Sequence, residues 1–423
     1  MRAKHIAELP SLADAEWLQR RPTRAVLEAL RAGGAEARAV GGAVRNALMG
    51  VPVKDVDIAT TAHPDDVIAL ARRAGLQAVP TGIEHGTVTV IADKVPYEVT
   101  TLRRDVETFG RHARVVFTTD WREDAMRRDF TMNALYCDAD GRVHDPLGGY
   151  GDLLARRVRF IGDARERIRE DYLRILRFFR FLALYGDATA PDAEGIAAAR
   201  AEKAGLAQLS GERIHAELMR LLAAPGAVAA LASMERNDLI EPVVGCGGDV
   251  GLVKRLAAIE QALDRPADPV LRLAALAGDA AADLPERLRL SGAEARQLAD
   301  ALERDPAFDP RTAEAAAKGF IYRHGVQAFV DGALLDWARS GDDAGSVARA
   351  DRVRLPERWT APPAPVRGGD VMARGIAPGP AVGRIIAAFE DWWIGAGFPS
   401  DERQAAAKLD ALVRGELEAR RET

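Results

Sequence analysis

The sequence predicts an α/β head at the N-terminus, a mixed sheet with helices, followed by an all-α neck, body and tail. Up to about residue 150, short segments rich in β-branched residues alternate with amphipathic helical segments. From about Arg165 onward, Ala, Leu, Arg and Glu recur at helical spacing and strand signals nearly vanish. The length of 423 residues, with 48% hydrophobic and 29% charged, is typical of two or three globular units.

Helices and short strands are expected to alternate in the head. Thr23–Ala32 has the pattern of an amphipathic helix, and a short helical turn is expected before it over Asp14–Gln19. Pro64 suits the first turn of a helix over 64–74, because the N–H that proline lacks would be unpaired there anyway. The other expected elements are a strand over Ala37–Val40, a helix over Ala43–Met49, an extended segment over Val53–Thr60, and adjacent strands over Gly86–Ala92 and Tyr97–Leu102.

Proline and glycine divide the helical remainder. Breaks are expected at Ala190-Pro191, at residues 224–226 and at residues 245–248. A second helical block runs to about Asp336, a loop-rich passage follows over 341–365, and a final helical segment begins at Pro380. The expected domains are therefore a head over 1–150, a helical neck over 151–250, and a helical body and tail over 251–423.

The net charge of −5 and pI of about 5.9 do not favour nucleic-acid binding by bulk charge. Of the 58 basic residues, only seven are lysine, so arginine supplies nearly all the positive charge. Arginine has a planar set of donors that suits phosphates and base edges. A functional argument must therefore depend on where the arginines lie.

Cysteine content and apolar runs give expectations about location. Cys137 and Cys246 are too few for a disulfide framework or a four-thiolate zinc site, so a reducing cytoplasm is expected. The N-terminal residues contain no continuous apolar core, so no signal peptide is indicated. No stretch approaches about 18 uninterrupted apolar residues, so no membrane span is expected.

The segment A-V-G-G-A-V-R-N gives a first indication of chemistry. Gly41 and Gly42 end the predicted strand and open the predicted helix, where missing Cβ atoms allow a phosphate to approach backbone N–H groups. Arg45 lies one turn inside the helix and can donate to the same phosphates. A dinucleotide-binding module would need G-x-G-x-x-G, which this segment does not supply.

Two carboxylates follow on the next extended segment. Asp55 and Asp57 are separated by one residue, so on a strand they project from one face, roughly 6–7 Å apart. Such a pair can hold two Mg²⁺ ions about 3.5–4 Å apart, the geometry of in-line phosphoryl transfer. Val56 and Ile58 are expected to bury the opposite face.

The order of these motifs resembles a known family. Gly-Gly followed after about a dozen residues by Asp-x-Asp is similar to the signature of the polymerase β-like nucleotidyltransferases. Four later blocks, E-D-A-M-R-R-D-F-T-M-N-A-L, D-P-L-G-G-Y-G-D-L, R-E-D-Y-L-R-I-L-R-F-F-R-F and G-E-R-I-H-A-E-L, resemble the ordered motifs of class II CCA-adding enzymes and their bacterial poly(A) polymerase relatives. They begin at Glu123, Asp145, Arg169 and Gly211, and the resemblance covers about residues 35–220.

The resemblance assigns roles in nucleotide binding. Arg127 and Arg128 are suited to neutralising a triphosphate, and the family pattern singles out Arg128 as the nucleotide contact. On the helix expected to begin near Glu170, the positions that match the family's nucleotide-binding residues are Asp171, Arg174, Arg177 and Arg180. In the next block, Glu212-Arg213 is expected to support that helix.

Asp171 and Arg174 suggest how a base could be selected. Their i, i+3 spacing makes them neighbours on one helix face. A carboxylate only accepts hydrogen bonds and a guanidinium only donates them, so together they match the amino group and ring nitrogen of cytosine or adenine. Uracil and guanine present the opposite pattern. Each unpaired buried group costs roughly 1–3 kcal/mol, so the two mismatches reject both bases.

Two further features bear on the chemistry. Glu98, on a strand expected beside that of Asp55 and Asp57, and Asp129 are both candidates for a third carboxylate, and the residues alone leave the choice open. The polar segment over 103–121, with Gly110, resembles the flexible loop that allows CCA-adding enzymes to switch from C to A.

The resemblance implies template-independent addition of C, C and A to the 3′ end of tRNA. CTP and ATP would be the substrates and two Mg²⁺ ions the cofactor, with Asp55 and Asp57 as ligands and Glu98 or Asp129 as the third catalytic carboxylate. The neck would select the base and the helical body and tail would hold the tRNA, with neither a membrane nor an obligate protein partner indicated. Alternatives are a poly(A) polymerase, an A-only or CC-only enzyme of this family, and a non-catalytic RNA-binding protein.

Overall fold

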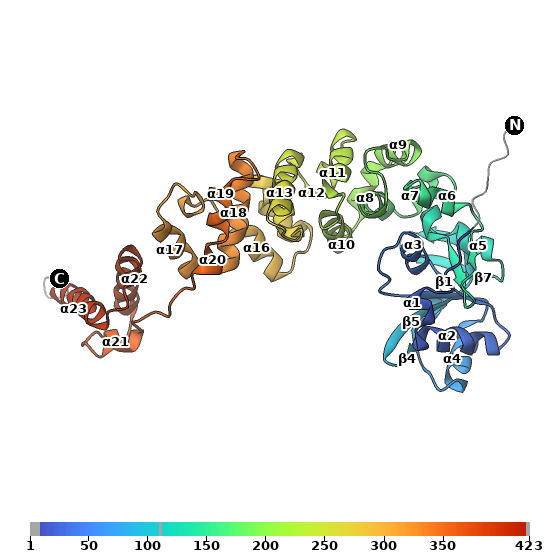
Figure 1. The fold of residues 1–423 in the computed structure, drawn as a ribbon, viewed down its shortest axis with the longest axis horizontal. Coiled ribbons are helices and arrows are strands. Elements are labelled where there is room, and N and C mark those ends of the chain that lie inside the picture. Colours follow the sequence, from blue (N-terminus) through green and yellow to red (C-terminus); the bar gives the residue numbers. More distant parts are fainter. Residues whose placement is uncertain (1–8, 110–111, 420–423) are drawn as a thin grey trace. The chain divides into compact units, whose positions relative to one another are not determined.

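The computed structural model describes residues 9–109 and 112–419. The chain divides into two compact units, residues 1–246 and 247–423, and among the described residues every strand lies in the first unit (Figure 1). The predicted class, a mixed-sheet head followed by helices, is confirmed. No helix of the described residues is long and apolar enough to cross a membrane.

A seven-stranded mixed sheet forms the centre of the head. Its strand order is β3-β4-β5-β2-β1-β8-β9, with β2 and β5 parallel and the other neighbours antiparallel. The predicted adjacent strands, here β4 and β5, pair directly. The strands are β1 (Ala37–Val40), β2 (Asp57–Thr60), β3 (Gln77–Gly82), β4 (Thr87–Ala92), β5 (Val95–Thr101), β8 (Tyr136–Asp138) and β9 (Val143–His144).

The extended segment predicted over Val53–Thr60 is shorter in the structure. Strand β2 begins at Asp57, so Asp55 precedes it. The reason is the length of its partner: β1 pairs Ala37 with Thr60 and Val40 with Asp57, and then Gly41 turns the chain away with φ of 68°. Residues beyond the end of the ladder have no partner to keep them in the sheet.

The predicted helices of the head are confirmed within one or two residues at most ends. Helices α2 and α4 pack against each other and against β4, burying Val26, Leu27 and Val67. Val56 and Ile58 are buried as predicted. The helices are α1 (Glu16–Gln19), α2 (Arg21–Ala32), α3 (Gly42–Leu48), α4 (Pro64–Arg73), α5 (Trp121–Met126) and α6 (Gly149–Leu154).

The segment expected as a flexible loop over 103–121 is instead largely a β-hairpin. Strands β6 (Arg103–Phe109) and β7 (His112–Phe117) pair with each other, and Gly110 lies outside the described residues. The base of the hairpin is fixed because the Thr118 N–H donates to the Leu102 carbonyl at 2.9 Å. Phe117 also packs edge-on against His63 with ring centroids 5.1 Å apart.

The helical part of the first unit packs around α8. This helix buries Ile175, Leu176, Phe178 and Phe179, and it contacts both α10 and α11. Leu173 is also buried against the unit, and Leu184 is half-buried. The helices are α7 (Ala164–Glu170), α8 (Leu173–Tyr185), α9 (Ala193–Ala201), α10 (Gly211–Leu222), α11 (Ala227–Arg236) and α12 (Glu241–Val244).

The second unit is helical throughout its described residues. The passage predicted as loop-rich contains two short helices, α19 and α20; the Ser346 hydroxyl caps the first, and Pro356 lies in the first turn of the second. Two-thirds of the way along the unit, α21 to α23 form a core of their own. The helices are α13 (Val250–Ala262), α14 (Pro269–Ala277), α15 (Leu284–Arg287), α16 (Gly292–Leu302), α17 (Glu314–His324), α18 (Val326–Ser340), α19 (Val347–Val353), α20 (Leu355–Arg358), α21 (Gly368–Met372), α22 (Pro380–Gly395) and α23 (Glu402–Ala419).

A buried carboxylate in α18 makes the stability of this unit depend on pH. Asp331 is 2% exposed and accepts hydrogen bonds from the amides of Gln297 (3.0 Å) and Gln327 (2.8 Å). Burial, aided by the nearby Asp268 carboxylate, raises the pKa of Asp331 from 3.8 to about 6. Because the folded state binds the proton more tightly, its stabilising effect is complete below pH 3.8 and is lost as the pH rises through about 6.

We therefore predict that raising the pH from 5 to 7.5 removes about 1.4 kcal/mol of unfolding free energy through Asp331. The measurement is urea unfolding followed by tryptophan fluorescence at both pH values, comparing the wild-type protein with Asp331→Asn. This contribution should disappear in Asp331→Asn and persist in Asp283→Asn, which changes an exposed carboxylate of the same unit. Equal pH dependence in wild type and Asp331→Asn would contradict the prediction.

Candidate active site

A pocket of about 470 Å³ in the first unit brings most of the predicted site residues together. It is bounded by the start of α3, the end of the sheet at β2, the segment 128–133 and one side of α8. Its lining residues are Gly41, Gly42, Arg45, Asp57, Arg128, Asp129, Asn133, Asp171, Leu173, Arg174, Arg177, Phe181 and Arg213.

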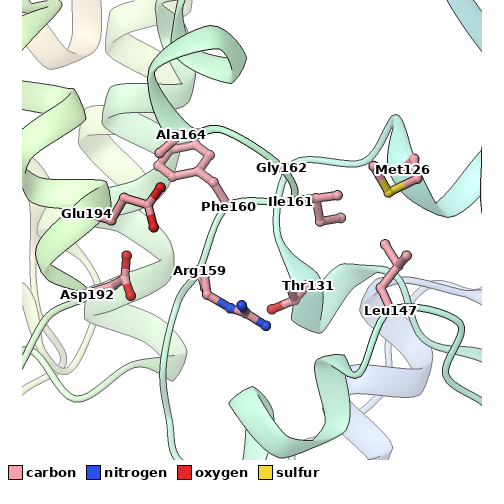
Figure 2. A pocket seen from close by; sticks show the side chains of 10 residues that line it. All are labelled: Met126, Thr131, Leu147, Arg159, Phe160, Ile161, Gly162, Ala164, Asp192 and Glu194. Atoms are coloured by element: carbon pink, nitrogen blue, oxygen red, sulfur yellow. The ribbon is translucent and has the colours of Figure 1, made fainter.

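A second cavity, of about 280 Å³, contains none of the predicted site residues. In Figure 2 the Arg159 side chain extends towards Thr131, and Asp192 and Glu194 lie across the cavity from Leu147. Arg159 and Thr131 both donate to the buried Asp152 carboxylate, at 2.8 and 2.7 Å. Arg159 and Thr131 are thus already committed to Asp152.

The glycine pair opens the larger pocket as the sequence predicts. Gly41 has φ of 68°, a conformation that L-residues with a side chain rarely adopt, and α3 begins at Gly42. A Cβ atom added at Gly41 would lie 3.9 Å from Nη1 of Arg128. The missing side chain therefore leaves open the space between the start of α3 and that guanidinium group.

Of the three predicted acidic residues, Asp57 lines this pocket, whereas Asp55 and Glu98 lie near Asp57 but outside the lining. The register of β2 and β5 pairs Ile58 with Val99, so one residue further along Asp57 lies beside Glu98. The pKa of Asp57 is raised, chiefly by burial of its carboxylate in the pocket and then by the charges of Glu98 and Asp55, while Arg128 opposes the shift. By solvent-accessible area Asp57, Asp55 and Glu98 are all exposed residues, so the carboxylates can be reached from solvent. Repulsion among three carboxylates is what a bound divalent cation would relieve.

Asp129, the other candidate for a third carboxylate, is committed to different partners. Its oxygens accept hydrogen bonds from Arg177 Nε at 3.0 Å and from the Asn133 amide at 2.8 Å. Burial would raise its pKa, but Arg177 and these hydrogen bonds outweigh burial and lower it to about 2. Asp129 is thus an ionised, fully engaged side chain, whereas Glu98 lies beside Asp57.

The oxygen ligands at this site have the chemistry that Mg²⁺ prefers. As the side chains stand, no group of three His, Cys, Asp or Glu residues in the described part of the chain converges closely enough to hold a metal ion. Asp57 and its neighbours Asp55 and Glu98 thus supply oxygen ligands of the right chemistry, but as they stand they do not form a closed metal site.

Arg128 is held by a buried carboxylate. It donates to Asp124 at 2.9 Å and to the Tyr136 hydroxyl at 3.2 Å, and Arg127 donates to the same carboxylate at 2.8 Å. Burial would raise the pKa of Asp124, but Arg128 and Arg127 lower it to about 2. Of the two arginines, Arg128 lines the pocket, and its orientation is set by Asp124 and Tyr136.

The structure corrects the helical position of Asp171. Helix α7 ends at Glu170 and α8 begins at Leu173, so Asp171 lies in the break with φ of −156° and ψ of 106°. Its carboxylate accepts hydrogen bonds from the N–H of Leu173 at 3.2 Å and from Arg213 at 2.7 Å. The side chain caps α8, which is the local reason why the helix is interrupted.

Asp171 and Arg174 are consequently not paired with each other. Arg174 donates to the Glu170 carboxylate and to the Arg167 carbonyl, the latter at 2.7 Å. Both Asp171 and Arg174 nevertheless line the pocket. The support expected from Glu212-Arg213 is found for Arg213, through its contact with Asp171.

Arg177 and Arg180 share a carboxylate that the sequence did not single out. Glu217, buried in α10, lies 2.6 Å from Arg180 and 3.7 Å from Arg177. Arg177 lines the pocket, whereas Arg180 lies outside its lining. Three residues that do line the pocket were not singled out by the sequence: Asn133, Leu173 and Phe181. Asn133 lies four residues after Asp129, but only the fold shows that their side chains meet.

Comparisons with known proteins show what the first unit resembles. A family model described as "Poly A polymerase head domain" matches residues 37–159, and one described as "Probable RNA and SrmB- binding site of polymerase A" matches residues 192–244. The fold of the head is therefore that of a polymerase head domain.

Relatives that match over most of the chain show to which family of polymerases it belongs. The chain is 36% identical over 373 residues to the CCA tRNA nucleotidyltransferase 1, mitochondrial, of Danio rerio, covering 85% of this chain and 83% of that protein. It is 32% identical over 372 residues to the CCA-adding enzyme of Limosilactobacillus fermentum, covering 86% and 90%. The crystal structure of the Bacillus stearothermophilus CCA-adding enzyme in complex with CTP matches with a TM-score of 0.75 at 27% identity, covering 95% and 98%. The chain belongs to the family of CCA-adding enzymes.

The contact between Arg213 and Asp171 yields a prediction about nucleotide selection. Arg213→Gln removes one of the two groups that orient Asp171, so discrimination between CTP and UTP should fall by about 5- to 150-fold. The measurement is single-turnover incorporation of each nucleotide.

Arg236→Gln is the matched control, because Arg236 is an exposed arginine of the neighbouring helix α11. Unchanged discrimination in Arg213→Gln would show that Arg213 does not orient Asp171 for base selection.

Proposed function

We propose that this chain adds C, C and A to the 3′ end of tRNA, using CTP and ATP and no nucleic-acid template. Membership of the CCA-adding family over most of the chain supports the reaction. The observation that carries the proposal is the shared pocket: Asp57, the Gly41-Gly42 opening and the Asp171 and Arg174 side chains line one cavity.

In this proposal Asp55 and Asp57 hold two Mg²⁺ ions, with Glu98 as a third carboxylate. When bound, such ions lower the pKa of the terminal ribose hydroxyl of the tRNA and stabilise the pyrophosphate leaving group. Glu98 is favoured over Asp129 because it lies beside Asp57, while Asp129 is engaged by Arg177 and Asn133.

Three arginines of the pocket, Arg45, Arg128 and Arg177, bind the nucleotide's phosphates. Arg45 and Arg128 lie at the glycine-lined opening, and Arg177 projects from α8. Arg180 does not line the pocket, and it contributes through its contact with Glu217. A planar guanidinium group can donate two parallel hydrogen bonds to a phosphate. The same groups thus bind the triphosphate in the ground state and the pyrophosphate as it departs.

Base selection falls to Asp171 and Arg174. The Asp171 carboxylate accepts from the amino group of cytosine or adenine, and Arg174 donates to the adjacent ring nitrogen. Uracil and guanine place a carbonyl against the carboxylate and an N–H against the guanidinium, so both are rejected. The break between α7 and α8 supports this role because it leaves the Asp171 side chain at the pocket rather than on a continuous helix face.

Residues 1–150 form the catalytic head in this proposal, 151–250 the neck that selects the base, and 251–423 the body and tail that bind tRNA. A reducing cytoplasmic location is supported by the free Cys137 and Cys246, while the Danio rerio relative is a mitochondrial form. The poly(A) polymerase alternative has less support, because relatives that match over more than four-fifths of the chain are CCA-adding enzymes.

We expect the protein to incorporate CMP and then AMP into a tRNA that lacks its CCA end, and to reject UTP and GTP. The measurement is incorporation of each labelled nucleotide, with product length read on a gel. Incorporation of A alone, onto RNA that does not end in CC, would favour a poly(A) polymerase; failure to add the final A would favour a CC-only enzyme.

Asp57→Ala should reduce nucleotide addition by at least about a thousandfold, since it removes a ligand on which transition-state charge stabilisation of several kcal/mol depends. Binding of tRNA, measured by filter retention, should change little. Asp66→Ala, which removes an exposed carboxylate of α4, is the control for loss of an acidic residue. Undiminished addition by Asp57→Ala would contradict the assignment of this pocket as the active site.

A further inference from the structure

The guanidinium group of Arg45 is buried among neutral partners. Arg45 is 6% exposed, yet it lines the pocket. Its Nη2 donates to the Tyr185 hydroxyl and to Asn46 Oδ1, both at 2.9 Å, and its Nη1 donates to Asn133 Oδ1. Among the described residues it forms no ion pair; Asp129 acts on it at longer range, through Asn133.

The other arginines of the pocket are each paired with a carboxylate. Arg128 is bonded to Asp124, Arg174 to Glu170, Arg177 to Asp129, and Arg213 to Asp171. A charge already bonded to a carboxylate attracts a phosphate less strongly, because the carboxylate cancels part of it, even where two arginines share one carboxylate as at Asp124. Within the described part of the lining, Arg45 is therefore the cation whose charge is least compensated.

Tyr185 fixes this cation from the neck helix. It lies at the end of α8, 140 residues along the chain from Arg45, and its hydroxyl accepts the Nη2 hydrogen bond. The Arg45 guanidinium carbon also lies 4.0 Å from the centroid of the Tyr185 ring and 5.1 Å from that of Phe181. A cation over an aromatic face is attracted without losing its charge, so these partners orient Arg45 without neutralising it.

We propose that Tyr185 is a positioning residue that holds Arg45 for the triphosphate of the incoming nucleotide. The inference rests on the proposed function, since it concerns the same pocket. It implies that the contribution of the Tyr185 hydroxyl to ligand affinity increases with the number of phosphate charges on the ligand and does not depend on the base. A purely structural role would weaken every ligand of the pocket to the same degree.

The test compares CTP with cytidine 5′-monophosphate, each titrated calorimetrically into the full chain. Tyr185→Phe removes the hydroxyl and keeps the ring, and should weaken CTP binding about tenfold while changing monophosphate binding by less than twofold. Tyr185→Leu also removes the ring and should weaken CTP binding further. The KM for CTP in nucleotide addition should rise in the same order.

Tyr322→Phe is the matched control, because it removes a phenol hydroxyl that is hydrogen-bonded to Glu390 in the second unit. Equal weakening of CTP and the monophosphate, or no change in either, would overturn the role of Tyr185. Absence of C addition by the wild-type protein would instead overturn the proposed function, and the binding ratios would still decide whether Tyr185 orients Arg45 towards phosphate.

Discussion

The pocket depends on the packing of Phe130 against the neck. Its ring centroid lies 4.9 Å from those of both Phe160 and Phe181, and the ring is fully buried. Residues on either side of it, Asp129 and Asn133, contact Arg177 and Arg45. The aromatic cluster therefore fixes α8 against the end of the sheet. Without it, the carboxylates of the head and the base-selecting side chains of the neck would not share one cavity.

Most of the positive charge in the pocket is carried by arginines that are bonded to carboxylates. This bonding weakens the attraction of each arginine for phosphate, but it also orients the guanidinium group. Glu217 shows the principle most clearly, since one buried side chain contacts both Arg177 and Arg180. The carboxylates thereby allow several arginines, which would otherwise repel one another, to lie close together.

Local pattern was sufficient to predict much of the head. Strand β1, helix α3 and the glycines between them follow from residue type and spacing alone, and so does the placement of Asp57 on a strand. Asp171 was assigned to the wrong environment, because i, i+3 spacing assumes a continuous helix, whereas the carboxylate caps α8 and pairs with Arg213. Partners that come from distant segments, such as Glu217 and Tyr185, leave no local signal.

The parallel pairing of β2 with β5 has a consequence for the stability of the folded protein. Asp57 and Glu98 become neighbours only through that pairing, because about 40 residues of chain separate them. An unfolded chain has no such acidic pair, so any divalent ion shared by the two carboxylates binds the native sheet selectively and stabilises it by mass action. If such an ion binds there, removing it would lower the free energy of unfolding of the head as well as the rate of nucleotide addition.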